Sequence, residues 1–142
     1  MKKILIIFSV LIIILFSISY FQKSRSNHEE GIEISFRDQK RFLPYSKILS
    51  IEKSNFSTKQ NHKMNGYDLV KILKALDIPA SIETEYSFHS KDGGTLKLIK
   101  KQNETFYLLF KEDADGHYLR LIIPSDEFSQ RWLKYITSIE IK

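Results

Sequence analysis

Residues 82–98 read IETEYSFHSKDGGTLKL, and this stretch decides the fold. Ile82, Tyr86 and Phe88 alternate with polar residues, which is the period-two pattern of a strand that buries one face. The residues KDGG, 91–94, supply the positive-φ positions that a hairpin turn requires. Two leucines then resume the alternation, so the stretch predicts a β-hairpin.

One amphipathic helix is predicted before this hairpin. Residues 69–76 place leucine, valine and isoleucine at spacings that form a single apolar helix face. Asp68 is a suitable N-cap, since its carboxylate can accept a free backbone N–H of the first turn. Pro79 lacks the N–H that would continue a helix and is expected to end it.

Other segments predict further strands. The alternation in residues 32–36 indicates a half-buried strand, and the apolar run 105–110 indicates a central strand covered on both faces. The remaining expectations are a strand over 48–56, a turn or hairpin rim over 57–65, a turn over 112–116, a strand over 118–123, a short helical turn over 125–133 and an edge strand containing Ile139 and Ile141. Together they predict an α+β fold, with a mixed, mostly antiparallel sheet and one principal helix.

The composition allows one folded domain and excludes several kinds of chemistry. The 142 residues include ten Phe, seven Tyr and one Trp, more aromatic side chains than a disordered chain carries. Cysteine is absent, which excludes disulfides, thiolate metal sites, iron–sulfur clusters and cysteine nucleophiles. The net charge is +5, but the 22 basic residues are dispersed. We therefore expect no nucleic-acid partner and a basic surface beside anionic lipid.

A hydrophobic segment at the N-terminus predicts the topology. Lys2 and Lys3 precede residues 4–21, which carry no charge and as a helix would span about 27 Å, close to the roughly 30 Å of a bilayer core. We predict a cytoplasmic tip (1–3), a transmembrane signal anchor (4–21), a polar linker (22–30) and an extracytoplasmic α+β domain (31–142). The chain would then be a single-pass protein of the cell membrane.

The alternative is a cleaved signal peptide. Ser17 and Ser19 offer small residues at the usual −3 and −1 places, and cleavage near Ser19 would secrete the domain. The apolar run continues through Tyr20 and Phe21, and an Ala-x-Ala site is missing, which favours the anchor. Both alternatives export the domain.

Four blocks in the second half of the chain resemble one family of enzymes. They are GYDL at 66–69, FHSKDG at 88–93, YLRLIIP at 118–124, and RWL at 131–133 before the last strand. The molybdopterin-binding domain of sulfite-oxidase-type oxidoreductases shows, in the same order, a Gly-x-x-Leu helix start, a Ser-x-Asp-Gly hairpin, a Leu-Arg-Leu-Val-Val-Pro strand and a Lys-Trp-Leu. The resemblance implies the molybdopterin-domain fold of that family, preceded here by the predicted transmembrane helix.

Two departures from this family concern its cofactor. Those enzymes hold molybdenum through a cysteine thiolate, and this chain has no cysteine. Asp126 and Glu127 stand where the family has a basic, glycine-containing stretch, and their charges would repel a pterin phosphate. The resemblance thus implies a reduced scaffold, for which we expect no cofactor, with molybdopterin as the alternative.

Three residues are candidates for ligand binding. No catalytic residue or metal ligand is predicted, because the four histidines stand far apart and no nucleophile motif is present. If a ligand is bound, we expect Arg120, Arg131 and Trp132 to be cofactor-binding residues that offer guanidinium groups to an oxyanion and an indole for stacking. For Arg120, an ion pair with a carboxylate of a neighbouring strand is favoured over an anion site. For Trp132, core packing is favoured over a position at the edge of a pocket.

Two classes of function remain. The first is a membrane-tethered, extracytoplasmic, non-catalytic binding or accessory domain, with the membrane and an envelope protein as partners. The second is a molybdopterin-dependent oxidoreductase or its cofactor-binding subunit. The missing thiolate and the short domain favour the first, so we expect the chain not to be an enzyme.

Protease added to intact spheroplasts should digest the domain of residues 31–142, because two lysines before an uncharged segment favour a cytoplasmic N-terminus. Immunoblotting against the C-terminus measures this loss, and a cytoplasmic marker protein should stay intact. If the protease digests the domain only after the spheroplasts are lysed, the predicted topology is contradicted.

Overall fold

A computed structural model describes residues 30–80 and 84–142 of the chain. The predicted cytoplasmic tip, the predicted anchor (4–21) and the linker up to residue 29 lie outside the described residues. In the described part, no helix has the length and apolar character needed to cross a membrane. Residues Gly31–Lys142 form one compact unit.

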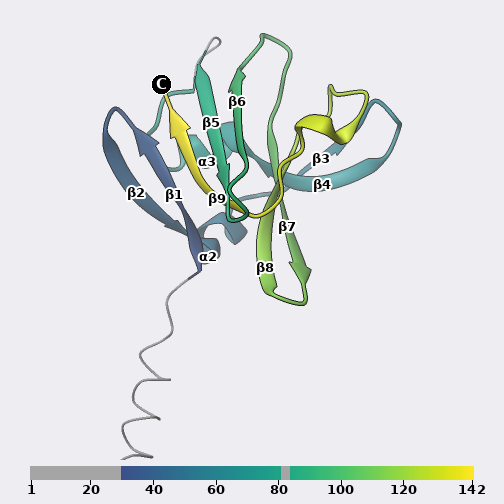
Figure 1. The fold of residues 1–142 in the computed structure, drawn as a ribbon. Helices are drawn as coiled ribbons and strands as arrows, with labels where there is room; N and C mark the ends of the chain where they lie inside the picture. The colour runs from purple at the N-terminus through teal and green to yellow at the C-terminus, as the bar shows by residue number, and fades with distance from the viewer. Residues whose placement is uncertain (1–29, 81–83) are drawn as a thin grey trace, which may run out of the picture. The chain divides into compact units, whose positions relative to one another are not determined.

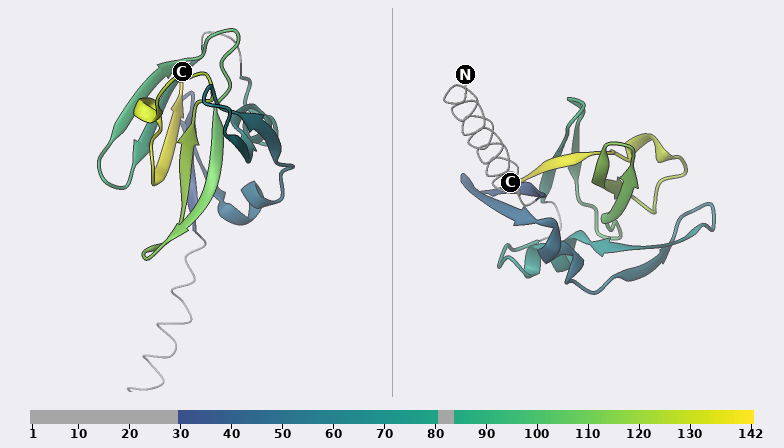
Figure 2. Two further views of the ribbon diagram at one scale, coloured as in Figure 1. Left: turned by 90° about the vertical axis from the view of Figure 1, so that its right-hand side faces the viewer. Right: turned by 90° about the horizontal axis from the view of Figure 1, so that it is seen from below.

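The described strands form two sheets, where the sequence predicted a single one (Figure 1). The five-stranded sheet has the order β2-β1-β9-β5-β6, with β1 (Gly31–Phe36), β2 (Gln39–Pro44), β5 (Glu85–Ser90), β6 (Thr95–Ile99) and β9 (Ile136–Ile141). The four-stranded sheet has the order β3-β4-β7-β8, with β3 (Ser54–Ser57), β4 (Lys63–Asp68), β7 (Tyr107–Asp113) and β8 (Gly116–Ile122). Figure 2 shows the β3–β4 hairpin extending away from β1 and β2. Two short α-helices, α2 (Tyr45–Leu49) and α3 (Leu69–Lys74), and the 3-10 helix η1 (Ser129–Arg131) complete a strand-rich α+β fold.

The predicted hairpin at 82–98 is confirmed from Glu85 onwards, while Ile82 and Glu83 lie outside the described residues. Strands β5 and β6 pair antiparallel, with Tyr86 opposite Leu98 and Phe88 opposite Leu96. The turn contains Gly93 at φ +87°, a conformation that costs glycine little because it has no Cβ. Tyr86 and Phe88 are fully buried, so the apolar face of the alternation is the face that packs into the core.

The last strand is central, and the prediction that it would lie at an edge is wrong. Strand β9 pairs in parallel with β1 and antiparallel with β5. Ile139 lies opposite Ile34 on one side and Phe88 on the other, and all three side chains are buried. Every other strand pair in the described residues is antiparallel, so the single parallel pair joins the first strand to the last.

The predicted principal helix is confirmed as α3, but it ends earlier than expected. The Asp68 carboxylate accepts the Val70 N–H at 2.8 Å, which makes Asp68 the N-cap. The helix stops at Lys74 rather than at Pro79, because Asp77 takes a left-handed conformation (φ +56°) and the Ile78 N–H turns back to the Leu73 carbonyl.

Two other local predictions need correction. The strand expected over 48–56 begins only at Ser54, because Ile48 belongs to α2 and Ile51, three residues further on, also packs on the core. The helical turn expected over 125–133 contains only η1, which begins without a side-chain cap. Asp126 is not a cap, since its carboxylate binds Arg131.

The core is organised around three aromatic rings. Phe106 meets Tyr86 and Phe88 edge-on, at centroid distances of 5.4 and 5.9 Å. The Phe106 carbonyl also accepts the Leu69 N–H at the start of α3, which fixes the helix against this cluster. Strand β7 begins directly after Phe106, and both Leu108 and Leu109 are buried, as predicted for a strand covered on both faces.

Replacing Leu73 with alanine should lower the free energy of unfolding by about 2–5 kcal/mol, because the side chain is fully buried and a cavity would remain. Lys74→Ala, at an exposed position of the same helix, is the control and should change it by less than about 0.5 kcal/mol. Chemical denaturation measures both values, and a loss for Leu73→Ala as small as that of the control would contradict its burial.

Candidate functional site

Arg120 and Trp132 are brought together by the edge of β8. The Leu121 N–H donates to the Leu133 carbonyl at 2.8 Å, so the segment after η1 runs along this strand. The Trp132 indole N–H donates to the Ile123 carbonyl at 3.1 Å. In this arrangement the guanidinium carbon of Arg120 lies 5.5 Å from the centroid of the Trp132 ring, which is a cation–π contact.

The ion pair expected for Arg120 is not formed within the described residues. Its neighbour across the strand pair is Leu109, which has no charge to offer. The Nε atom of Arg120 is buried and has no hydrogen-bond partner among the described residues. The aromatic ring of Trp132 therefore takes the place of the expected carboxylate.

Arg131 is directed into a separate ion-pair cluster. Its Nη2 donates to Oε1 of Glu104 at 2.9 Å, and its Nε lies 3.1 Å from both carboxylate oxygens of Asp126. Glu104 is 5% exposed, so the carboxylate that Arg131 contacts there is largely removed from water. Hydrogen bonding to Asp126, and secondarily to Glu104, raises the pKa of Arg131. Of the three candidate residues, two thus contact each other and the third is engaged by two carboxylates.

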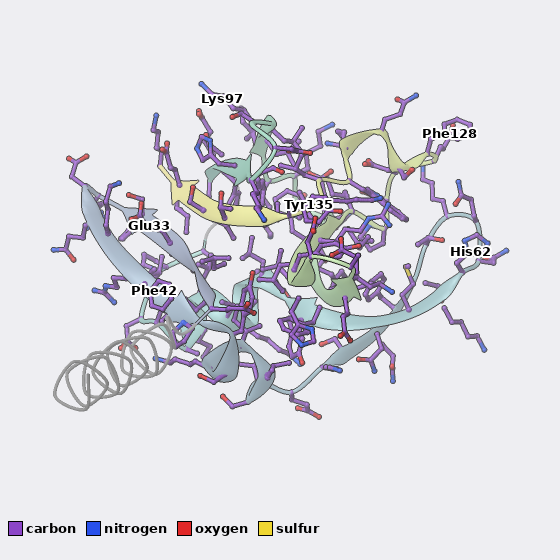
Figure 3. The ribbon with its side chains drawn as sticks, turned by 60° about the horizontal axis from the view of Figure 1, so that its bottom comes forward. Glu33, Phe42, His62, Lys97, Phe128 and Tyr135 are labelled. Carbon is purple, nitrogen blue, oxygen red and sulfur yellow. The ribbon has the colours of Figure 1, made fainter. Side chains whose placement is uncertain are left out.

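A cavity that the sequence did not reveal lies between two hairpin turns and the start of β9. It has a volume of about 300 Å³, and we call it the Tyr135 cavity. Figure 3 shows Tyr135 at the start of β9, beside the β7–β8 hairpin. Its lining comes from four separate segments: Tyr45; Lys91 and Asp92; Asp113, Asp115, Gly116, His117 and Tyr118; and Tyr135, Ile136 and Thr137.

Tyr135 itself has an unusual backbone conformation. Its φ is +55°, a left-handed value that is rare and costly for a bulky residue. Contacts from both hairpin turns hold it there, since its carbonyl accepts the Lys91 N–H at 2.9 Å and its hydroxyl donates to Oδ2 of Asp113 at 2.7 Å. Among the described non-glycine residues with positive φ, Tyr135 has the one aromatic side chain, which makes this position a candidate functional site.

Aromatic rings form much of the wall. The Tyr118 and Tyr135 rings lie 4.5 Å apart at an interplanar angle of 41°. On the other side, Tyr45 meets Phe110 edge-on at 5.1 Å, and Phe110 stacks on His117 at 5.2 Å. These contacts limit the motion of the side chains that surround the cavity.

Hydrogen bonds shift the pKa values of three ionisable side chains in the cavity, those of Asp113, Tyr135 and Asp92. The hydroxyl of Tyr135 and the Asp115 N–H both donate to Asp113 and lower its pKa, with Lys91 and Lys134 adding to the effect. The same hydrogen bond raises the pKa of Tyr135 to about 12. The Ser90 hydroxyl and the Gly94 N–H lower the pKa of Asp92. At neutral pH the cavity therefore presents two fixed carboxylates and a neutral phenol.

The sequence carried little signal for this cavity. Residues 112–116 read as a solvated hairpin turn, and Tyr135 lies outside every motif of the sequence. What makes the site is the left-handed φ of Tyr135 and the meeting of segments up to 90 residues apart, from Tyr45 to Tyr135. Neither can be read from local pattern.

Comparison with known proteins identifies no relative of this chain. No protein-family model, curated protein or solved structure matches this chain. Within residues 30–80 and 84–142, no group of three or more histidine, aspartate or glutamate side chains is placed to hold a metal ion.

Replacing Tyr135 with phenylalanine should raise the pKa of Asp113 towards its ordinary value, because the main hydrogen bond to the carboxylate is lost. The wild-type pKa is depressed by folding, so its stabilising effect is present above about pH 4 and is lost as the pH falls through the lower folded value. The stability difference between wild type and Tyr135→Phe should accordingly shrink below that pH.

Carbon-detected NMR of the Asp113 carboxyl measures the pKa, and thermal unfolding at a series of pH values measures the stability. Tyr118→Phe is the matched control, since the Tyr118 hydroxyl does not contact Asp113. An unchanged Asp113 pKa in Tyr135→Phe would show that this hydrogen bond does not set it.

Proposed function

We propose that the chain is a membrane-tethered, extracytoplasmic, non-catalytic binding or accessory domain that engages its ligand or envelope partner at the Tyr135 cavity. The observation that carries the proposal is the cavity itself, with a strained tyrosine held by two hairpin turns and an aromatic wall. Such a rigid, partly apolar hollow is typical of a small binding site.

The protonation states in the cavity favour binding over acid–base catalysis. A general acid or base works best with a pKa near the ambient pH. The pKa of Tyr135 is raised to about 12, and those of Asp92 and Asp113 are lowered. At neutral pH Tyr135 therefore stays neutral, while Asp92 and Asp113 stay ionised. Such constant charges suit a binding surface.

The residues suggested for a pterin do not fit that ligand. The guanidinium of Arg131 is already bound by Glu104 and Asp126, and a pterin phosphate would have to displace both carboxylates. The guanidinium of Arg120 lies over the Trp132 ring, where a planar group would stack. These contacts support an accessory domain over an oxidoreductase, and they are compatible with a reduced form of the sulfite-oxidase-type scaffold.

The tether is proposed from the sequence and from the place where the chain enters the domain. Gly31, the first residue of β1, pairs with Pro44, and the next residue, Tyr45, lines the cavity. The nine-residue linker 22–30 can span at most about 32 Å. In the proposed topology, the linker length therefore sets the upper limit on the distance between the end of the anchor and the start of β1.

The natively expressed full chain should purify without molybdenum or pterin and should show no turnover of sulfite or sulfoxides, because no thiolate is present to hold the metal. Elemental analysis, pterin fluorescence after extraction and dye-coupled assays measure this. Molybdenum in a stoichiometric amount would overturn the non-catalytic proposal.

Site-specific photocrosslinking in intact cells tests the partner. A photoreactive residue at Ala114, an exposed position beside the cavity, should give a defined adduct that Tyr118→Ala abolishes. The photoreactive residue in place of Lys97, an exposed position on β6, is the control and should give no adduct. Equal adducts from both positions would argue against binding at the cavity.

A further inference from the structure

We propose that the Tyr135 cavity binds a small organic cation, an ammonium or quaternary ammonium group, between tyrosine rings and carboxylates. This inference rests on the proposed function only in taking the cavity as the binding site. It adds the chemical class of the ligand, which neither the sequence motifs nor the family resemblance suggests.

The aromatic lining provides the first reason. Three tyrosines, Tyr45, Tyr118 and Tyr135, line a single cavity of about 300 Å³. The faces of aromatic rings carry negative potential and attract cations, and quaternary ammonium ligands are commonly held by several such rings. The Tyr118 and Tyr135 rings lie 4.5 Å apart at an interplanar angle of 41°, so together they form one continuous aromatic part of the wall.

The charges provide the second reason. The lining includes three carboxylates, from Asp92, Asp113 and Asp115, and one lysine, Lys91. Lys134 acts on Asp113 from outside the lining, so the carboxylates still outnumber the lysines. Lowered pKa values keep Asp92 and Asp113 ionised. An anionic ligand would meet a net negative field here, whereas a cation is stabilised by it.

The carboxylates have different parts in this site. Both oxygens of Asp113 accept internal hydrogen bonds, from the Tyr135 hydroxyl and the Asp115 N–H, so Asp113 mainly holds the wall in place and contributes its charge. Asp115 is exposed at the rim, and its side chain accepts no hydrogen bond within the described residues. Asp115 is therefore the group that would contact the ligand's charge directly.

The size and the openness of the site limit the ligand further. A volume of about 300 Å³ is at the lower end for ligand pockets, which suits a group the size of choline. Tyr118 and Tyr135 are half-exposed, so the cavity is open on one side. A free cation and the same headgroup carried by a lipid could both enter, and the experiment must separate them.

Titration of the full chain in maltoside micelles with choline tests the inference. The matched ligand is 3,3-dimethylbutan-1-ol, which has the shape of choline without the charge. NMR chemical shifts of the Tyr118 and Tyr135 rings report binding at the cavity. We expect choline to bind at least about tenfold more tightly than the neutral alcohol.

Variants then separate the rings from the charge. Tyr118→Ala should weaken choline binding by about tenfold or more, while Tyr118→Phe, which keeps the ring, should stay within about threefold of wild type. Asp115→Asn, at an exposed position, should weaken binding by about threefold or more at low salt and by less at high salt. Should Tyr118→Ala fail to fold, Asp115→Asn and the neutral alcohol still decide the result.

Each outcome has a defined meaning. Equal affinity for choline and the alcohol, or binding unchanged in both Tyr118→Ala and Asp115→Asn, would overturn the inference. Stronger binding to phosphatidylcholine vesicles than to phosphatidylglycerol vesicles would identify the lipid headgroup as the source, and binding of free choline alone would identify a soluble cation. If no cation binds while the Ala114 adduct remains, the cation inference fails and the proposed function stands.

Discussion

The placement of β9 between β1 and β5 is the interaction on which the rest of the domain depends. Ile139 joins the two flanking strands, with Ile34 on one side and Phe88 on the other. Without β9, the β1–β2 and β5–β6 hairpins would have no hydrogen bonds to each other. The strand also fixes the chain just before it, because Ile136, its first residue, is buried and Tyr135, with its φ of +55°, directly precedes it. The strained tyrosine of the cavity is thus joined directly to the strand that closes the larger sheet.

Local pattern was a good guide to elements and a poor guide to their neighbours. The hairpin at 85–98 and the helix start at Asp68 could be predicted because their signals, alternation, glycine turns and capping, act within a few residues. The position of β9 could not, since backbone hydrogen-bonding groups are the same in every strand and its isoleucines suit an edge as well as a centre. Ile48 shows the same limit at short range: a run of apolar residues fits strand or helix until its burial is known.

The sequence likewise predicted only part of the candidate site. The sequence identified Arg120, Arg131 and Trp132 as residues of note, and the structure places Arg120 and Trp132 in contact but binds Arg131 to Glu104 and Asp126. A carboxylate 27 residues away cannot be assigned to an arginine from spacing, and neither can a ring that replaces an expected ion pair. The Tyr135 cavity could not be predicted from the sequence at all, because it exists only when four distant segments meet.

The parallel pairing of β1 with β9 also bears on how the chain folds as it is made. Strand β1 is synthesised before all the other described strands and β9 after them, so their contacts have the largest sequence separation in the domain. Contacts of this kind close long loops and form slowly. The five-stranded sheet cannot be completed before β9 has left the ribosome. Until then β1 and β5 lack the strand that joins them, and the domain stays incompletely folded.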